Sequence, residues 1–135
     1  MIEAHALPVL ARLSAVITSP RKVFVGRVDP PVTNLAATPY VLARFAEAMP
    51  ALGFTGVTHL YALRVACHCV GASEMAAMQM ADLVAGALQD FTPTVPNRKC
   101  FPMRWDDATG QSPNEATGTS VHNQIRVYLL RSVPA

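Results

Sequence analysis

The cluster Cys67-His68-Cys69 contains the residue types in this sequence that are best suited to chemistry. Thiolates and imidazole rings bind zinc, and a thiol beside a histidine can act as a nucleophile. In a β-strand, however, neighbouring side chains point to opposite faces, so both thiols share one face and His68 occupies the other. A structural zinc site needs four ligands and a thiol enzyme needs an oriented base, and no motif here supplies either. We therefore predict that Cys67 and Cys69 are buried core thiols, and that the chain has no catalytic residue, metal site or cofactor.

Charged residues gather in a few short groups, and each group has an ordinary explanation. The pair 106–107 (Asp-Asp) could act as two carboxylates, but adjacent residues at a strand end point in different directions. We interpret it as the solvated entry to a loop. The basic pairs Arg21-Lys22 and Arg98-Lys99 could meet phosphates, although exposed surface charge is the simpler interpretation. The sequence contains neither a phosphate-binding glycine loop nor a dinucleotide-binding fingerprint, so these groups do not indicate an enzyme.

The segment 58–90 positions the cysteine cluster and organises the rest of the chain. Its first half alternates, which predicts a strand whose apolar face carries Tyr61, Leu63, Val65, Cys67 and Cys69. Gly71 ends this pattern, and Ser73 is suited to cap a helix. The following helix has one apolar stripe, formed by Ala77, Met80, Ala81, Val84 and Leu88. We predict that the strand and the helix pack together as one unit.

The N-terminal part of the chain is predicted to contain one helix and two strands. Apolar spacing indicates a helix over about 7–17, with Pro8 in its first turn, where proline is tolerated. A short strand follows at 23–25, and a second strand is predicted to begin at Tyr40. Residues 43–49 fit either a helix or the tail of that second strand.

The C-terminal part is predicted to hold two strands on either side of a long polar loop. The first covers 99–105, where Pro102 favours an edge or a bulge. The loop covers 107–120, which is long for a compact domain and therefore typical of a functional segment. The last strand covers 121–133, where every second residue is aliphatic: Ile125, Val127 and Leu129.

The predicted elements follow the order α-β-β-β-α-β-β, which indicates an α+β fold. We expect a single domain over 1–135, with a mainly antiparallel sheet packed against two helices. A chain of 135 residues has too little material for a second core.

The composition favours contact with other proteins. Apolar residues make up 51% of the chain and charged residues 15%, below the roughly 25% charged content of a typical soluble domain. Such sparse charge favours burial against partners, most simply other copies of the chain. The net charge of +2 is too small to indicate nucleic-acid binding. No apolar run is long enough to cross a membrane, no secretory signal is evident, and the three cysteines fit reduced thiols.

Four local features follow one another along the chain and together define its layout. A leading helix and a short strand precede a proline-rich turn and the segment 38–42 (TPYVL). The strand–helix unit contains LRVACHCVG at 63–71 and ADLV at 81–84. VPNR at 95–98 leads to a strand and a polar loop, and the chain ends on YLLRSVP at 128–134. This layout resembles the tail terminator (tail completion) proteins of long-tailed bacteriophages, particularly those of phages that infect actinobacteria.

The resemblance implies a structural role without catalysis. Tail terminators form a ring, usually of six subunits, that caps the head-proximal end of the tail tube. The ring ends tube polymerisation and provides the docking surface for the head. The implied partners are copies of the chain, the major tail tube protein and the head–tail connector proteins, with DNA passing through the lumen without sequence recognition and no membrane. The implied location is the tail of the virion, after synthesis in the host cytoplasm.

The polar loop and the first basic pair are the candidate contacts with a neighbouring subunit or with the tube. The length and composition of 107–120 suit an arm that becomes ordered on binding. The candidate interface residues are Arg21, Lys22, Asp107, Gln111, Asn114, Glu115 and Thr117. Three alternatives remain: a head–tail joining (neck connector) protein of the same virion, a small thiol-dependent enzyme, and a dimeric α+β binding module.

Overall fold

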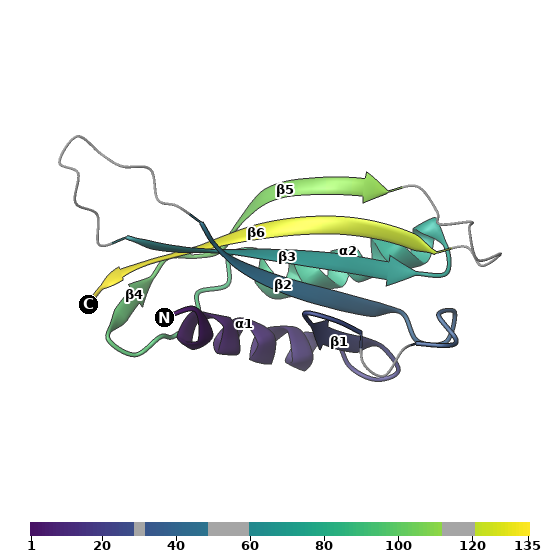
Figure 1. The fold of residues 1–135 in the computed structure, drawn as a ribbon, viewed down its shortest axis with the longest axis horizontal. Coiled ribbons are helices and arrows are strands. Elements are labelled where there is room, and N and C mark those ends of the chain that lie inside the picture. The colour runs from purple at the N-terminus through teal and green to yellow at the C-terminus, as the bar shows by residue number, and fades with distance from the viewer. Residues whose placement is uncertain (29–31, 49–59, 112–120) are drawn as a thin grey trace.

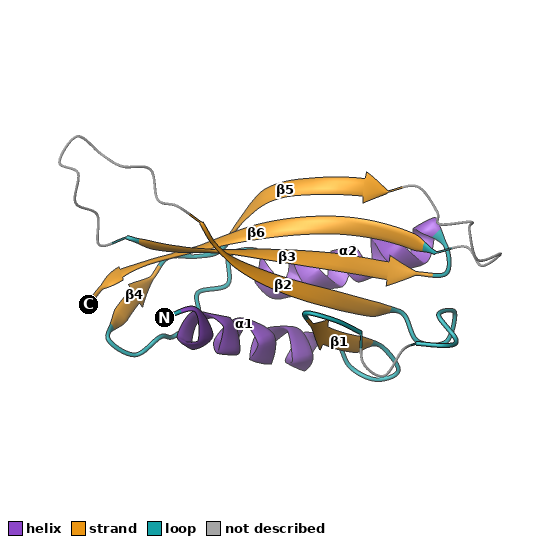
Figure 2. Ribbon diagram, in the orientation of Figure 1, coloured by secondary structure: helices purple, strands orange, loops and turns teal. Residues whose placement is uncertain are grey.

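The computed structural model of the chain describes residues 1–28, 32–48, 60–111 and 121–135, with the backbone alone at 48 and 107–111. Within these residues, two helices lie on the same side of one six-stranded sheet (Figure 1, Figure 2). The helices are α1 (Ile2–Val16) and α2 (Glu74–Leu88). The strands are β1 (Lys22–Val25), β2 (Tyr40–Ala48), β3 (Tyr61–Gly71), β4 (Arg98–Cys100), β5 (Arg104–Gln111) and β6 (His122–Pro134).

The sheet has the strand order β1-β2-β3-β6-β4, and β5 also pairs with β6. β1 and β2 are parallel, and every other named pair is antiparallel. The predicted fold class is therefore confirmed: an α+β domain with two helices and a mainly antiparallel sheet. None of the helices in the described ranges is long and apolar enough to cross a membrane.

The central strand–helix unit confirms the prediction from sequence. One side of β3 is fully buried at Leu63, Val65, Cys67 and Cys69. The predicted stripe of α2 is buried against the same core. Ser73 caps α2 by accepting a hydrogen bond from the Ala76 N–H at 3.1 Å. A Cβ at Gly71 would lie 2.7 Å from the Ala76 Cβ, so only glycine allows the helix to start this close to the strand.

The first helix is longer than predicted. α1 begins at Ile2 rather than near residue 7, so Pro8 lies inside the helix instead of in its first turn. An internal proline removes one backbone hydrogen bond. The additional N-terminal turn is stabilised by His5, which is fully buried and donates from its ring to the Met1 carbonyl at 2.8 Å.

Pairing between strands determines the length of β2 and the division of the segment 99–105. The local sequence did not decide the first and predicted the second wrongly. Residues 43–48 continue β2, because β2 pairs with β3 as far as Ala48 opposite Ala62. The single strand predicted over 99–105 is two strands, β4 and β5, with Pro102 between them. The observed order is therefore α-β-β-β-α-β-β-β, one strand more than predicted.

The observed strand β5 includes the first residues of the segment that was predicted to be a polar loop. Asp106 and Asp107 were expected at the entry to a loop, but both belong to β5, which continues to Gln111 opposite Asn123. Pairing with β6 holds this segment extended, with a bulge at Asp106 between the paired residues Trp105 and Asp107. The rest of the predicted loop, 112–120, lies outside the described residues.

The last strand is confirmed, but its more apolar side is not the side in the core. Tyr128 and Leu130 are buried beneath the helices. Because side chains alternate along a strand, Ile125, Val127 and Leu129 point away from the helices, where they are half-buried. The sheet therefore carries apolar side chains on both of its sides.

Candidate interaction surfaces

Cys67 and Cys69 lie in the core, as predicted. Burial raises the pKa of the Cys69 thiol to about 12, and burial together with the neighbouring Cys69 raises the pKa of Cys67. Because the thiolate is the nucleophile and the metal ligand, both side chains are held in their unreactive form. His68 lies on the opposite face, where burial and the nearby Arg44 guanidinium lower its pKa. Across the described residues, no three His, Cys, Asp or Glu side chains gather as a metal site would need.

A buried serine–histidine contact joins the two ends of the chain. The His5 ring donates from Nδ1 to the Met1 carbonyl, which leaves Nε2 to accept the Ser132 hydroxyl at 2.7 Å. The Arg98 Nε donates to the same hydroxyl oxygen at 3.2 Å. His5 and Ser132 are both fully buried, so no substrate can reach them. The contact is therefore a structural tie between α1, β4 and β6, and its members are too far apart in sequence for a motif to reveal it.

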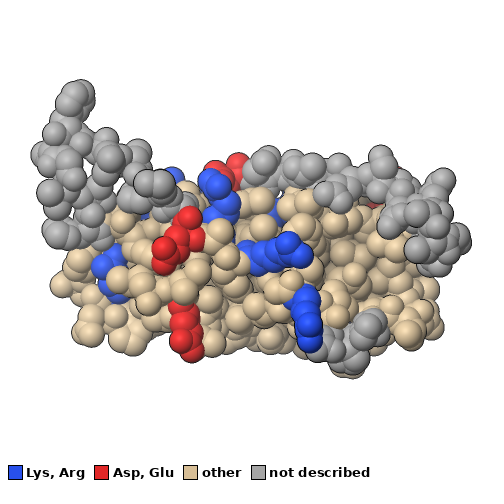
Figure 3. Space-filling view, in the orientation of Figure 1, with Lys and Arg blue, Asp and Glu red and all other residues tan. Residues whose placement is uncertain are grey.

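The side of the sheet away from the helices, called here the open face, is a broad candidate contact surface. Its centre is half-buried and apolar, with side chains from four strands: Phe24, Tyr40, Leu42, Ala66, Ile125 and Val127. Figure 3 shows few charged side chains among mostly uncharged atoms. Arg64 pairs with Asp106 of β5 at 3.3 Å. A surface of this composition can bury against another protein.

Two strands at opposite edges of the sheet each leave one side unpaired within the described part of the chain. β1 pairs with β2 alone, and β5 pairs with β6 alone. The two strands lie at opposite borders of the sheet (Figure 1). An unpaired strand presents N–H and C=O groups with which a strand of another chain can pair. The sheet therefore has two different edges whose backbone groups are open to strand pairing.

The predicted interface residues are divided between these edges. Arg21 and Lys22 are exposed at the start of β1, and Arg21 lines a pocket of about 250 Å³ beside α2. Asp107 and Gln111 are in β5, paired with β6. The structure therefore does not bring the two groups together. The remaining predicted residues lie outside the described part of the chain: Asn114, Glu115 and Thr117.

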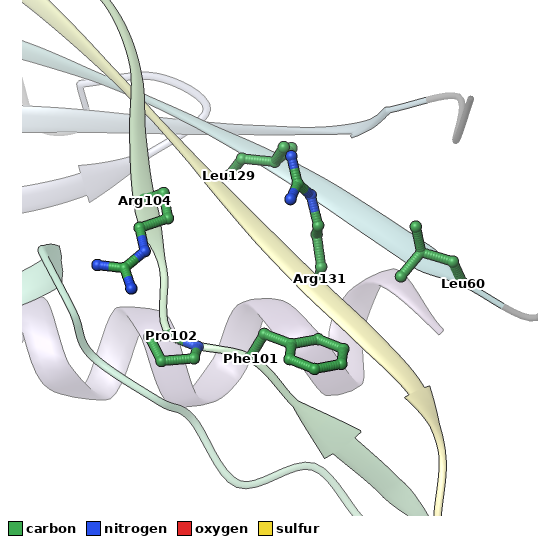
Figure 4. A pocket seen from close by; sticks show the side chains of 6 residues that line it. All are labelled: Leu60, Phe101, Pro102, Arg104, Leu129 and Arg131. Carbon is green, nitrogen blue, oxygen red and sulfur yellow. The ribbon is translucent and has the colours of Figure 1, made fainter.

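A second pocket, which sequence reasoning missed, opens where β4 and β5 separate along β6. It has a volume of about 420 Å³ and is lined by Leu60, Phe101, Pro102, Arg104, Leu129 and Arg131 (Figure 4). The Phe-Pro sequence at 101–102 could have indicated this pocket, because proline interrupts strand pairing and leaves space between the two strands. The pocket combines apolar walls with two guanidinium groups. It therefore suits a partner that is apolar and negatively charged.

These features define an α+β domain with one covered and one open sheet face. No protein-family model matches the chain, and no curated protein matches it in sequence. Among solved structures, the chain is similar to a chain in the virion of the native gene transfer agent (GTA) particle. The TM-score is 0.60 at 16% sequence identity, and the match covers 94% of this chain and 92% of that chain. At this identity the likeness shows a shared fold over almost the whole length of both.

Proposed function

We propose that this chain is a structural protein of a phage-like virion, without an enzymatic role. The observation that carries the proposal is the match to a chain of the GTA virion, which covers 94% of this chain. The surfaces support it, because the thiols of Cys67 and Cys69 and the serine–histidine contact are buried. What the described surface offers instead is an open apolar face and two unpaired strand edges.

Within the virion, the proposed role is that of the tail terminator. The subunits form a ring, usually of six, that caps the head-proximal end of the tail tube and ends its polymerisation. The two different sheet edges support this role, because a contact between unlike surfaces repeats and gives a ring when the rotation closes. The other partners are the major tail tube protein and the head–tail connector proteins, and DNA passes through the lumen.

A head–tail joining protein of the same virion is the second candidate. The fold match favours it equally, because a shared fold does not specify a position along the neck of the particle. The two candidates differ in what they bind. A terminator binds the end of the tail tube and stops its growth, whereas a joining protein binds the head side.

Assembly with tail tubes tests the proposal. The purified chain is mixed with tubes of the major tail tube protein and viewed by negative-stain electron microscopy, and its mass is measured by native mass spectrometry. The expected result is a ring that binds one end of the tube and prevents further elongation. Rings that bind only connector complexes would favour the joining protein. A monomer with no affinity for either would refute both roles.

A further inference from the structure

The pocket between β4 and β5 carries two guanidinium groups, and the described residues provide an acidic partner for only one of them. Arg131 is exposed on the open face, and it has no acidic partner among the described residues. Arg104 pairs with Asp90, so its charge is already engaged. The Phe101 side chain lines the same pocket (Figure 4). Phe101 is 41% exposed. The pocket therefore presents one available cation and an exposed aromatic side chain.

The outward side of α2 has the complementary chemistry. Met75, Met78 and Asp82 follow one another at steps of three and four residues, so they form one stripe along the helix, called here the α2 stripe. The two methionines are 63% and 44% exposed, and Asp82 is exposed as well. The helix contains acidic residues but neither Lys nor Arg. Methionine side chains adapt to irregular apolar surfaces, so the stripe suits an aromatic wall beside a cation.

The pocket and the α2 stripe cannot meet within one subunit. Arg131 points to the open face, whereas α2 packs on the covered side of the sheet. The pocket also lies near the start of β3, beside Leu60, while α2 begins beyond the end of that strand. β3 has 11 residues, which corresponds to roughly 35 Å of strand. A contact between the two surfaces therefore requires a second copy of the chain.

We propose that the pocket of one subunit receives the α2 stripe of a second copy, with Arg131 paired to Asp82 and Met78 packed on Phe101. The contact joins two unlike surfaces, so each added subunit leaves one pocket and one stripe free. Repetition extends the assembly until its rotation closes. This inference rests on the proposed ring and names a contact within it.

Charge reversal tests this pairing, because a contact between unlike surfaces can be repaired by mixing two defective variants. Arg131→Glu sets two carboxylates against each other, and Asp82→Arg sets two guanidinium groups against each other. Each variant alone should raise the concentration for half-assembly at least about tenfold. In an equal mixture, each subunit can bind the other variant on both sides, through one reversed pair and one native pair. The mixture should therefore assemble near the wild-type concentration, as measured by sedimentation velocity.

Matched controls separate the pairing from a general effect of charge. Lys99→Glu on β4 and Glu3→Arg on α1 reverse exposed charges outside both surfaces, so neither should change assembly. Phe101→Ala removes the aromatic wall without changing charge and should weaken assembly by itself. Circular dichroism checks that each variant is folded. Should Arg131→Glu fail to fold, Arg131→Gln and Phe101→Ala take its place.

Each outcome supports or overturns the inference. Normal assembly of Arg131→Glu or Asp82→Arg alone overturns it, and so does a mixture that assembles no better than its components. Variants that form normal rings but no longer bind tube ends would assign the pocket to the tube protein, which also overturns it. A wild-type chain that binds no tube and never self-associates refutes the proposed function itself, so the two failures are distinguishable.

Discussion

The two sides of the sheet contain similar residue types but have different surroundings. In β6, Leu130 is fully buried beneath the helices, while its neighbour Leu129 is half-buried on the open face. In β3, Val65 and Ala66 show the same contrast. The helices cover one side only (Figure 1). Hydrophobicity alone therefore does not say which side forms the core. The covered side stabilises the monomer, and the open side is the one that we propose for contact with a partner.

Shortening each of the two adjacent leucines of β6 should affect stability very differently on the two sides of the sheet. Leu130→Ala creates a cavity in the core and should lower the free energy of unfolding by about 2–5 kcal/mol. Leu129→Ala should lower it by about 1 kcal/mol or less, because this side chain already meets water in the monomer. Urea unfolding at a concentration where the chain is monomeric measures both. Equal losses would show that the open face belongs to the monomer core.

The buried hydrogen bond between His5 of α1 and Ser132 of β6 should stabilise the fold. His5→Leu removes the acceptor of the buried Ser132 hydroxyl, and this should lower the free energy of unfolding by about 1–3 kcal/mol. The double variant His5→Leu/Ser132→Ala should recover part of the loss, because the unpaired hydroxyl is then absent. The recovery is only partial, because Arg98 Nε loses its acceptor when Ser132 is replaced. Glu3→Ala, an exposed change on the same helix, is the control and should stay within about 0.5 kcal/mol. A loss no larger than this control would show that the tie does not stabilise the fold.

The pH dependence of stability tests whether His5 is held neutral on the covered side. Burial lowers the pKa of His5 below its usual 6.5, the hydrogen bond to the Met1 carbonyl opposes the shift, and the nearby Arg98 lowers it further. The unfolded chain binds a proton near pH 6.5 that the folded chain does not yet bind, so unfolding takes up a proton. Stability is therefore full above that pH and falls as the pH decreases. His68 contributes with the same sign, because burial and Arg44 lower its pKa.

Urea unfolding between about pH 7.5 and pH 5 measures this slope. Each histidine can contribute at most about 1.4 kcal/mol per pH unit. His5→Gln should give a shallower decline than the wild type, with His68 contributing to the slope that remains. An identical slope for the two proteins would contradict the assignment of a neutral, buried His5.

The elements that were predicted correctly are those whose structure depends on residues close together in the sequence. The alternation of β3 and the stripe of α2 are set by neighbouring residues, so both elements and their core sides were predicted correctly. The extent of β2 and the existence of β5 depend on pairing with β3 and β6, which no short window of sequence contains. The same cause hides the core side of β6, since the covering helices decide it.

The candidate surfaces were less predictable than the fold for the same reason. Arg21 and Lys22 are exposed as expected, but the pocket around Arg131 arises from residues that the chain brings together from distant segments. The start of α1 depends on His5, whose partner Ser132 lies near the other end of the chain. The composition favoured burial against partners, which stays a prediction, and the open face is the surface that we propose for it.

The ion pair between Arg64 and Asp106 on the open face should contribute little to the free energy of unfolding. Arg64 and Asp106 lie 3.3 Å apart, and both side chains remain well exposed to water. An exposed pair of this kind contributes about 0–1 kcal/mol, and salt screens it. Asp106→Asn should therefore lower the free energy of unfolding by less than about 1 kcal/mol at low salt, and the loss should vanish in high salt. A loss as large as that of His5→Leu, insensitive to salt, would mean that the monomer excludes water from this face as well, and that no partner is needed to cover it.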